Sequence, residues 1–395
     1  MIHELKLLTR SAARARHWLL DSAAPLWARS GRTPSGLFAE RLTLSGEPDD
    51  SYFRTFVQAR HIYSFVSFGE MGWTGPWREL VSETVETLLR NAKRQDGFFV
   101  HQLDSAAMPT DGRADLYDQA FVLLALAVSG SALGRPELFT EAELLWDLIE
   151  TRWGHPAGGF REGDIADAKL RRQNPHMHLL EALIELHRRS GRSRFWESAL
   201  RIAILGRDRF VDRGSGALRE YFELDLSPAA GPTGPIAEPG HCFEWAWLFE
   251  KLADLGWDEG TILSDQMTRF ARDAGIDRVR HVAINEVLLD GSARDATARL
   301  WPQTERIKAA AARFRRIRSP AEAAEAVDAA LGLEQYLGTR TKGLWRDKLR
   351  EDGSWVEEMV PGSSLYHISC AYAELDRLFG SAPLDLALSD IIPVQ

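Results

Sequence analysis

Apolar residues return every three to four positions along almost the entire chain, which is the spacing of one helix face. Gly, Pro and helix-capping residues interrupt this pattern at intervals. The pattern predicts twelve helices, at residues 4–29, 50–70, 76–93, 114–132, 136–153, 173–190, 193–211, 240–255, 258–274, 300–317, 319–336 and 364–379.

The connections between these helices alternate in length and repeat a motif. Those after even-numbered helices are short, such as 191–192, whereas those after odd-numbered helices run to roughly twenty residues or more. The long connections share a Gly followed by apolar and then charged residues: Gly36-Leu-Phe-Ala-Glu, Gly97-Phe-Phe-Val-His, Gly159-Phe-Arg-Glu, Gly216-Ala-Leu-Arg-Glu and Gly343-Leu-Trp-Arg-Asp. The sixth copy is expected in the stretch that begins at His281. The chain therefore repeats with a period near sixty residues.

A single helix–loop–helix unit cannot bury its own apolar face, so six such units must close on one another. The sequence therefore predicts an all-α fold, an (α/α)6 barrel of twelve helices formed by one domain over residues 1–395. The even-numbered helices form the inner ring. All long loops then emerge at one end, where the N-terminal ends of the inner helices line a mouth that we expect to be the active site.

Composition and charge narrow the classes of function. The net charge of -9 argues against a nucleic-acid partner, which requires a clustered basic surface. Two cysteines are too few for a disulfide framework, and no window has the run of about 18 apolar residues that a membrane span needs. Residues 1–20 lack a secretory apolar core. We expect a cytoplasmic protein without membrane contact; a homodimer is compatible with the sequence.

Polar and aromatic residues recur along the predicted inner helices at nearly the repeat period. They are Arg60, Tyr117, His178, His241, Trp301 with Glu305, and His367. Their consecutive spacings, counted through Trp301, are 57, 61, 63, 60 and 66 residues. If the repeat is real, these side chains converge on the barrel axis at similar depth. Three histidines in register indicate acid–base chemistry more strongly than any single histidine does.

Two of these histidines stand three residues before a glutamate, in His178–Glu181 and His241–Glu244. Residues three apart share a helix face, so we expect Glu244 to orient His241. A metal site is not predicted, because the Glu-x-x-His order of helical-bundle metal sites is reversed here. Neither a P-loop nor a Gly-x-Gly-x-x-Gly fingerprint occurs, so no nucleotide cofactor is expected.

The remaining histidines outside this register are expected to be surface or structural groups: His61, His101, His155, His187 and His281. His176 is intermediate, because it and His178 point to different faces of one helix. Glu244 and Glu305 leave a glycosidase open as an alternative, since that chemistry needs two opposed carboxylates.

Six segments of the chain, taken in order, resemble the N-acylglucosamine 2-epimerase superfamily. They are Gln58-Ala-Arg60, Asp115 to Phe121, Asn174 to Glu181, Pro239 to Trp247, Leu300 to Glu305 and Ser364 to His367. Within the superfamily the sequence looks most like the aldose–ketose isomerase branch of mannose and sulfoquinovose isomerases. The resemblance implies a metal-free reaction without a cofactor, through a cis-enediol of a monosaccharide.

The resemblance also assigns residues. It implies that His241 and His367 are the catalytic pair, and that Arg60, Tyr117, Asn174, His178, Glu244 and Glu305 bind the sugar or support the histidines; Trp301 lies in the same register. The hypothesis is that His241 moves the proton between C2 and C1, His367 assists ring opening and Arg60 stabilises the enediolate. The roles of the two histidines can be exchanged.

The favoured reaction is conversion of D-mannose to D-fructose. The alternatives are a sugar 2-epimerase, a mannose-6-phosphate isomerase, an (α/α)6 glycosidase or lyase, and a barrel that binds sugars without catalysis. A phosphate could be held by basic residues of the long loops, for which the candidates are Arg171, Arg172, Arg340 and Lys342.

Overall fold

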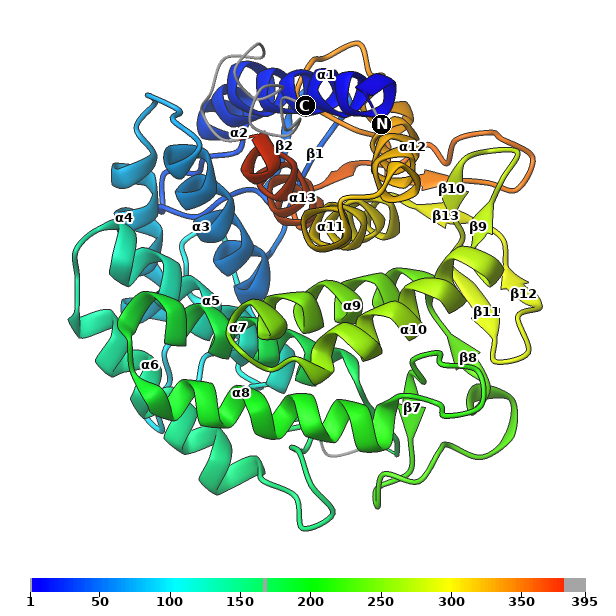
Figure 1. Cartoon of the computed structure of the whole chain (residues 1–395). Helices are drawn as coiled ribbons and strands as arrows, with labels where there is room; N and C mark the ends of the chain where they lie inside the picture. The colour runs from blue at the N-terminus through cyan, green and yellow to red at the C-terminus, as the bar shows by residue number, and fades with distance from the viewer. Residues whose placement is uncertain (1, 166–168, 380–395) are drawn as a thin grey trace.

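Two concentric rings of helices surround a common axis in the computed structural model, which describes residues 2–165 and 169–379 (Figure 1). The inner ring consists of α3 (Thr55–Glu70), α5 (Leu116–Ala132), α7 (Asn174–Ser190), α9 (Pro239–Asp254), α11 (Leu300–Ile317) and α13 (Ser364–Phe379). Each inner helix packs against the next, and α13 returns to α3. The ring is therefore closed, and the chain folds as the predicted (α/α)6 barrel.

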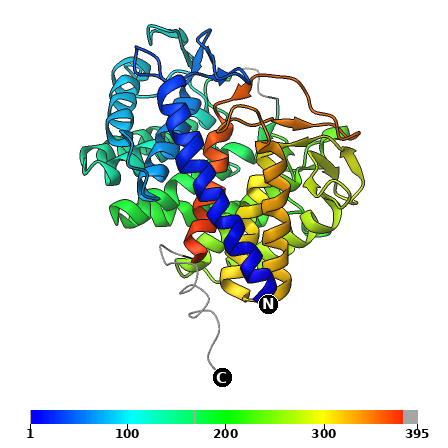
Figure 2. The same ribbon diagram turned by 90° about the horizontal axis from the view of Figure 1, so that it is seen from above.

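The outer ring is formed by the helices between them. Its segments are α1 (Ile2–Trp18) with η1 (Leu19–Ala23) and α2 (Ala24–Ser30), α4 (Trp77–Thr87) with η2 (Leu88–Ala92), α6 (Glu137–Leu148) with η3 (Ile149–Trp153), α8 (Ser193–Leu205) with η4 (Gly206–Phe210), α10 (Glu259–Ala274), and α12 (Pro320–Glu334) with η6 (Gln335–Leu337). Each covers an inner helix, and α1 lies across α13 beside α12 (Figure 2). The first and last helices of the chain thus close the barrel together.

Short antiparallel strands connect the long loops at one end of the barrel. They are β1 (Arg41–Leu42), β2 (Pro48–Asp49), β3 (Phe53–Arg54), β4 (Gln102–Leu103), β5 (Pro109–Asp111), β6 (Arg171–Arg172), β7 (Tyr221–Phe222), β8 (Ile236–Ala237), β9 (Ile276–Asp277), β10 (Val282–Ala283), β11 (Glu286–Leu288), β12 (Ala293–Asp295), β13 (Ala298–Arg299), β14 (Lys348–Leu349) and β15 (Val360–Pro361), with a 3-10 turn, η5 (Gly231–Thr233). Several pairs join loops from different repeats, such as β3 with β4 and β13 with β14.

The repeated Gly motif has a structural counterpart in each loop. In five repeats, a backbone amide just after the motif glycine, or its counterpart, donates to an inner-helix side chain: Phe38 to Gln58, Phe99 to Gln119, Phe160 to His176, Leu218 to Cys242 and Ala283 to Gln303. The motif positions require a left-handed backbone, with φ of 82° at Gly36 and 95° at Gly97. His281 takes this conformation in the expected sixth copy, with φ of 58°.

Helix boundaries differ from the prediction mainly at the first inner helix. It begins at Thr55 rather than at residue 50, because Phe53 and Arg54 form β3 and pair with Leu103 and Gln102 of the next loop. The core is one continuous cluster of buried apolar side chains between the two rings. Within the described residues, no helix is long and apolar enough to cross a bilayer.

Candidate active site

The residues predicted from the register and from the family resemblance lie near the N-terminal ends of the inner helices, within the part of the chain that the structure describes. They are Arg60, Tyr117, Asn174, His178, His241, Glu244, Trp301, Glu305 and His367. Tyr117 and Asn174 are partly buried, and the others are buried. Hydrogen bonds, ion pairs and ring contacts described below connect them into one group around the barrel axis.

His241 lies between two carboxylates at the start of α9. Its Nδ1 is 3.0 Å from Oε2 of Glu220 and 3.6 Å from Oε2 of Glu238. Burial disfavours a charged imidazole, but the two carboxylates outweigh it and raise the pKa of His241 to about 10. The ring is therefore protonated at neutral pH and suited to act as an acid.

The expectation that Glu244 orients His241 is wrong. Glu220, from the loop before β7, makes the hydrogen bond to the imidazole, whereas Oε1 of Glu244 accepts from the Lys308 ammonium at 3.4 Å. The reason is geometric: one helical turn carries Glu244 deeper into the barrel than His241, toward α11. A residue of a different element therefore supplies the partner.

Asn174 contacts the other nitrogen of this imidazole. Its Nδ2 is 3.1 Å from Nε2 of His241, and its Oδ1 is buried without a hydrogen-bond partner among the described residues. Because the two amide atoms are nearly equal in shape, a half-turn of the amide places Oδ1 where Nε2–H of a protonated imidazole can donate to it. That orientation satisfies both groups.

His367, at the start of α13, has the opposite electrostatic environment. Its Nδ1 lies 2.8 Å from Oε1 of Glu305. Burial, together with the positive charges of Arg60 and Lys308, holds the pKa of His367 well below its usual value. The imidazole is therefore neutral. No residue of the described chain forms a hydrogen bond with Nε2, so this nitrogen is free to accept a proton.

Trp301 lies between the two histidines. Its ring centroid is 4.7 Å from that of His241 and 5.9 Å from that of His367, and its side chain is 9% exposed. An indole in this position offers a flat apolar surface beside both acid–base groups. Such a surface suits the apolar face of a sugar ring.

Arg60 brings a positive charge to the same region without a carboxylate partner among the described residues. Its guanidinium donates to the Tyr117 hydroxyl at 2.7 Å and to the Ser363 carbonyl at 3.3 Å, and Nε is buried with no partner. The cation lies 4.3 Å from the centroid of the Phe121 ring. A cation held only by neutral groups can stabilise an anion that forms during a reaction.

His178 and Glu181 lie beside this group on α7. Nδ1 of His178 is 3.7 Å from Oε2 of Glu181, which also accepts a hydrogen bond from the Tyr366 hydroxyl. Burial lowers the pKa of His178, so its ring is neutral. The predicted pair on one helix face is therefore close in space, at a distance longer than a hydrogen bond.

Several carboxylates and histidines are close enough to be considered as metal ligands. One such group is Glu244, Glu305 and His367, whose ligand-type atoms lie within 4.8 Å of one another. The ammonium of Lys308 already forms ion pairs with both carboxylates of this group. The chain itself thus supplies the neutralising cation. The same contacts argue against the glycosidase alternative, because the two carboxylates share one cation instead of facing each other across a substrate.

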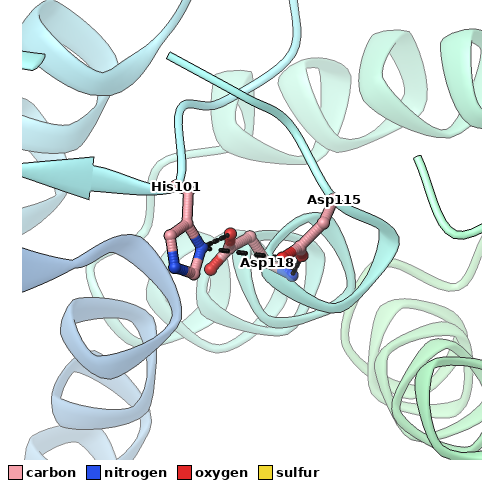
Figure 3. Close-up of side chains that lie close together, drawn as sticks. All are labelled: His101, Asp115 and Asp118. Atoms are coloured by element: carbon pink, nitrogen blue, oxygen red, sulfur yellow. Dashed lines mark hydrogen bonds and ion pairs between the residues drawn. The ribbon is translucent and has the colours of Figure 1, made fainter. Parts of the chain in front are cut away.

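His101 belongs to a separate cluster at the start of α5. Its Nδ1 is 2.7 Å from Oδ2 of Asp118 and 3.6 Å from Oδ2 of Asp115, and the ring faces both carboxylates (Figure 3). Asp118 also accepts from the backbone amide of Phe56, and Asp115 caps α5 by accepting from the amide of Asp118. These contacts attach the loop to two inner helices next to Tyr117. These contacts give His101 a structural role.

Sequence reasoning missed three residues of the site: Glu220, Glu238 and Lys308. Glu220 follows the motif Gly216-Ala-Leu-Arg. The same motif position holds Glu40, which contacts Arg54 before α3, and Asp347, which accepts from Ser364 of α13. The repeat therefore contained a signal: the polar residue that ends each motif contacts the start of an inner helix. Lys308 gave no such signal.

The fold is a helical barrel whose mouth carries a pair of histidines, and the comparisons with known proteins show the family to which it belongs. The N-acylglucosamine 2-epimerase (GlcNAc 2-epimerase) family model matches residues 36–371. The chain belongs to this family of sugar isomerases and epimerases.

Similar proteins cover nearly the full length of the chain. A mannose-6-phosphate isomerase of Rhizobium meliloti (strain 1021) is 39% identical over 369 residues, which is 91% of this chain and 95% of that protein. The crystal structure of a sugar epimerase from a ruminal bacterium has a TM-score of 0.85 at 18% identity, covering 94% of this chain and 100% of the other. A D-mannose isomerase structure has a TM-score of 0.83 at 18% identity, with 91% and 96% covered.

Proposed function

We propose that this protein interconverts D-mannose and D-fructose through a cis-enediol, by acid–base catalysis without a metal ion or cofactor. The observation that carries the proposal is the pair of histidines on either side of Trp301, one neutral and one protonated. Isomerisation needs a base for the weakly acidic C2 proton and an acid for the oxygens, and this pair provides both. One similar protein is named a mannose-6-phosphate isomerase and another a D-mannose isomerase, and both names support a sugar of the mannose type.

The electrostatics favour exchanging the roles of the first hypothesis. His367 is neutral, with Nδ1 at the Glu305 carboxylate, so its Nε2 can remove the proton from C2 and return it to C1. His241 is protonated by the influence of Glu220 and Glu238. During opening it can donate to the ring oxygen and take back the proton of the anomeric hydroxyl; during isomerisation it can donate to the C1 oxygen and take back the proton of the C2 hydroxyl. Arg60 stabilises the negative charge of the enediolate.

One experiment tests whether the protein acts on D-mannose, which product it forms and whether it needs a metal ion. Proton NMR of the purified protein with D-mannose in D2O, with and without EDTA, is expected to show fructose formation and loss of the C2 proton signal, both unaffected by EDTA. Glucose as the first product would instead establish 2-epimerisation. Binding of mannose without deuterium exchange would establish a barrel that only binds sugars.

Mannose 6-phosphate is a second candidate substrate, favoured by a specific feature of the mouth. Arg299 and Lys348 are directly opposed in the pair of β13 with β14, where two like charges repel unless an anion lies between them. The Arg299 side chain is 46% exposed, and its nearest carboxylate, Asp347, is 4.0 Å away. Lys348 is already paired with Glu358 at 2.9 Å, so Arg299 is the cation of this pair that lacks a close carboxylate and can bind a phosphate.

Two of the four basic residues first considered for a phosphate, Arg171 and Arg172, are already engaged. Arg171 is buried and donates to the carbonyls of Gly158 and Phe160, and Arg172 forms a salt bridge with Glu162. Parallel assays with D-mannose and its 6-phosphate decide between the substrates. A kcat/KM for the phosphate at least about tenfold above that for mannose, a difference of about 1.4 kcal/mol, would favour the phosphorylated sugar.

A further inference from the structure

Lys308 is a fully buried lysine that the reaction described above does not use. It stands on α11, one turn after Glu305, and its side chain has no exposed surface. The ammonium forms an ion pair with Oε2 of Glu305, donates to Oε1 of Glu244 at 3.4 Å and lies 3.9 Å from the centroid of the Trp247 ring. The ammonium therefore lies next to two carboxylates and the face of an indole ring, all of negative potential.

Lys308 is connected to the proposed base through one carboxylate. Glu305 uses Oε2 for Lys308 and Oε1 for Nδ1 of His367, at 2.8 Å. The protonation state of Glu305 decides the tautomer of that imidazole. An ionised Glu305 accepts the Nδ1 proton and leaves Nε2 with a lone pair, whereas a protonated Glu305 donates to Nδ1 and moves the ring proton to Nε2.

We propose that Lys308 is a positioning residue that holds Glu305 ionised and thereby keeps the Nε2 atom of His367 available as a base. This inference rests on the proposed function for its catalytic consequence, and the tautomer itself can be observed without any activity. Lys308 touches no reacting atom. It acts through Glu305.

Removal of the Lys308 ammonium should raise the pKa of Glu305. Glu305 and Glu244 are both buried. Burial and the Glu244 charge raise the pKa of Glu305 well above its usual value, and the adjacent Lys308 ammonium is the main influence that opposes this rise. Other charged or titratable groups face the cluster from the surrounding helices and loops: Arg60, His178, Glu181, Glu244, Arg299 and Cys370. Of these groups, Glu181 raises the Glu305 pKa further. Loss of the ammonium should therefore leave Glu305 protonated at neutral pH.

The test is Lys308→Met, which keeps the length of the side chain and removes its charge. We expect kcat to fall by about 100-fold at neutral pH, because a well-placed base contributes a rate factor of about this size. KM should be nearly unchanged. The rising limb of the kcat profile should move to higher pH, because Glu305 then has a higher pKa and becomes ionised only at higher pH. In a Glu305→Gln background the same substitution should have little further effect on kcat.

Lys251→Met is the matched control. Lys251 is a lysine of the inner ring whose side chain is 11% exposed. Its Nζ lies 4.7 Å from the centroid of the same Trp247 ring and 3.6 Å from carboxylate oxygens of Glu185 and Glu374. Its carboxylates do not contact a histidine. The control should lose stability in a similar way and keep the pH profile of kcat. A folded Lys308→Met protein with the profile of the wild type would overturn the proposal.

A measurement on the unmodified protein covers the case in which Lys308→Met does not fold. Nitrogen-15 NMR of the protein labelled at histidine, with His367→Asn to assign the signal, is expected to show protonated Nδ1 and unprotonated Nε2 at pH 7. The opposite tautomer would overturn the proposal. If the wild type exchanged the C2 proton of neither D-mannose nor its 6-phosphate, the proposed function would fail, while this spectrum would still decide the role of Lys308.

Discussion

Replacing Glu220 by Gln should move the alkaline limit of activity to lower pH. Glu220 is 4% exposed, and its Oε2 is 3.0 Å from Nδ1 of His241. Two unit charges at that distance attract by roughly 5 kcal/mol at an effective dielectric constant of about 20. Since one pKa unit corresponds to about 1.4 kcal/mol, the carboxylate can account for up to about 4 units. Glu238 remains at 3.6 Å, so the expected decrease is smaller.

The pKa of His241 should fall from about 10 toward about 8, a decrease of about 2 units. As an acid, His241 works in its protonated form, so activity is lost as pH rises through this pKa. The falling limb of the kcat profile for mannose isomerisation should therefore shift to lower pH by about 2 units. The assay is fructose formation between pH 6 and 10, with saturating sugar at each pH.

Glu162→Gln is the control for the loss of a buried carboxylate. Glu162 is 5% exposed and occupies the corresponding motif position in another repeat, where it pairs with Arg172 and does not contact a histidine. Its substitution should leave the falling limb in place. If Glu220→Gln kept the wild-type limb, His241 would not act as the protonated acid, and the reasoning from its two carboxylates would be refuted.

The pKa of His241 also predicts the pH dependence of stability. Its value in the folded state, about 10, lies above the usual unfolded value near 6.5, so its contribution to the free energy of unfolding is complete below about pH 6.5 and is lost as pH rises toward 10. Thermal unfolding between pH 6 and 10 should show a smaller loss of Tm with rising pH in Glu220→Gln than in the wild type. An equal loss in both proteins would contradict the assignment.

Three further substitutions test the remaining groups. His367→Ala should lower kcat by about 1,000-fold with a normal circular dichroism spectrum, and near-normal turnover would exclude it as the base. Arg60→Met should lower kcat by about 100-fold, because the enediolate loses its cation; a change confined to KM would assign Arg60 to binding alone. Arg299→Ala should weaken use of mannose 6-phosphate by about tenfold in kcat/KM and leave mannose unaffected, and equal effects on both sugars would argue against a phosphate site.

The sequence by itself determined the architecture, because the architecture depends on periodic features. Helical spacing placed the twelve helices, and the alternation of short and long connections placed every second one inside the barrel. The repeat of about sixty residues even located the sixth loop motif, where His281 takes the left-handed backbone that Gly has elsewhere. The same register predicted residues that come together around Trp301, since equivalent positions of a closed ring lie at equal depth.

Only the tertiary structure decided which charged groups are partners. Glu220 contacts His241 from a loop 21 residues earlier, and Lys308 of α11 contacts Glu244 of α9 across 64 residues. Glu238, three residues before His241, adds the second carboxylate from the helix start. The i, i+3 rule favoured Glu244 as the partner of His241, because it considers one helix alone. The protonation states of the two histidines also depend on the tertiary structure. Both histidines are buried, but they differ in charge. Two carboxylates stabilise the protonated form of His241, whereas burial and the positive charges of Arg60 and Lys308 keep His367 neutral.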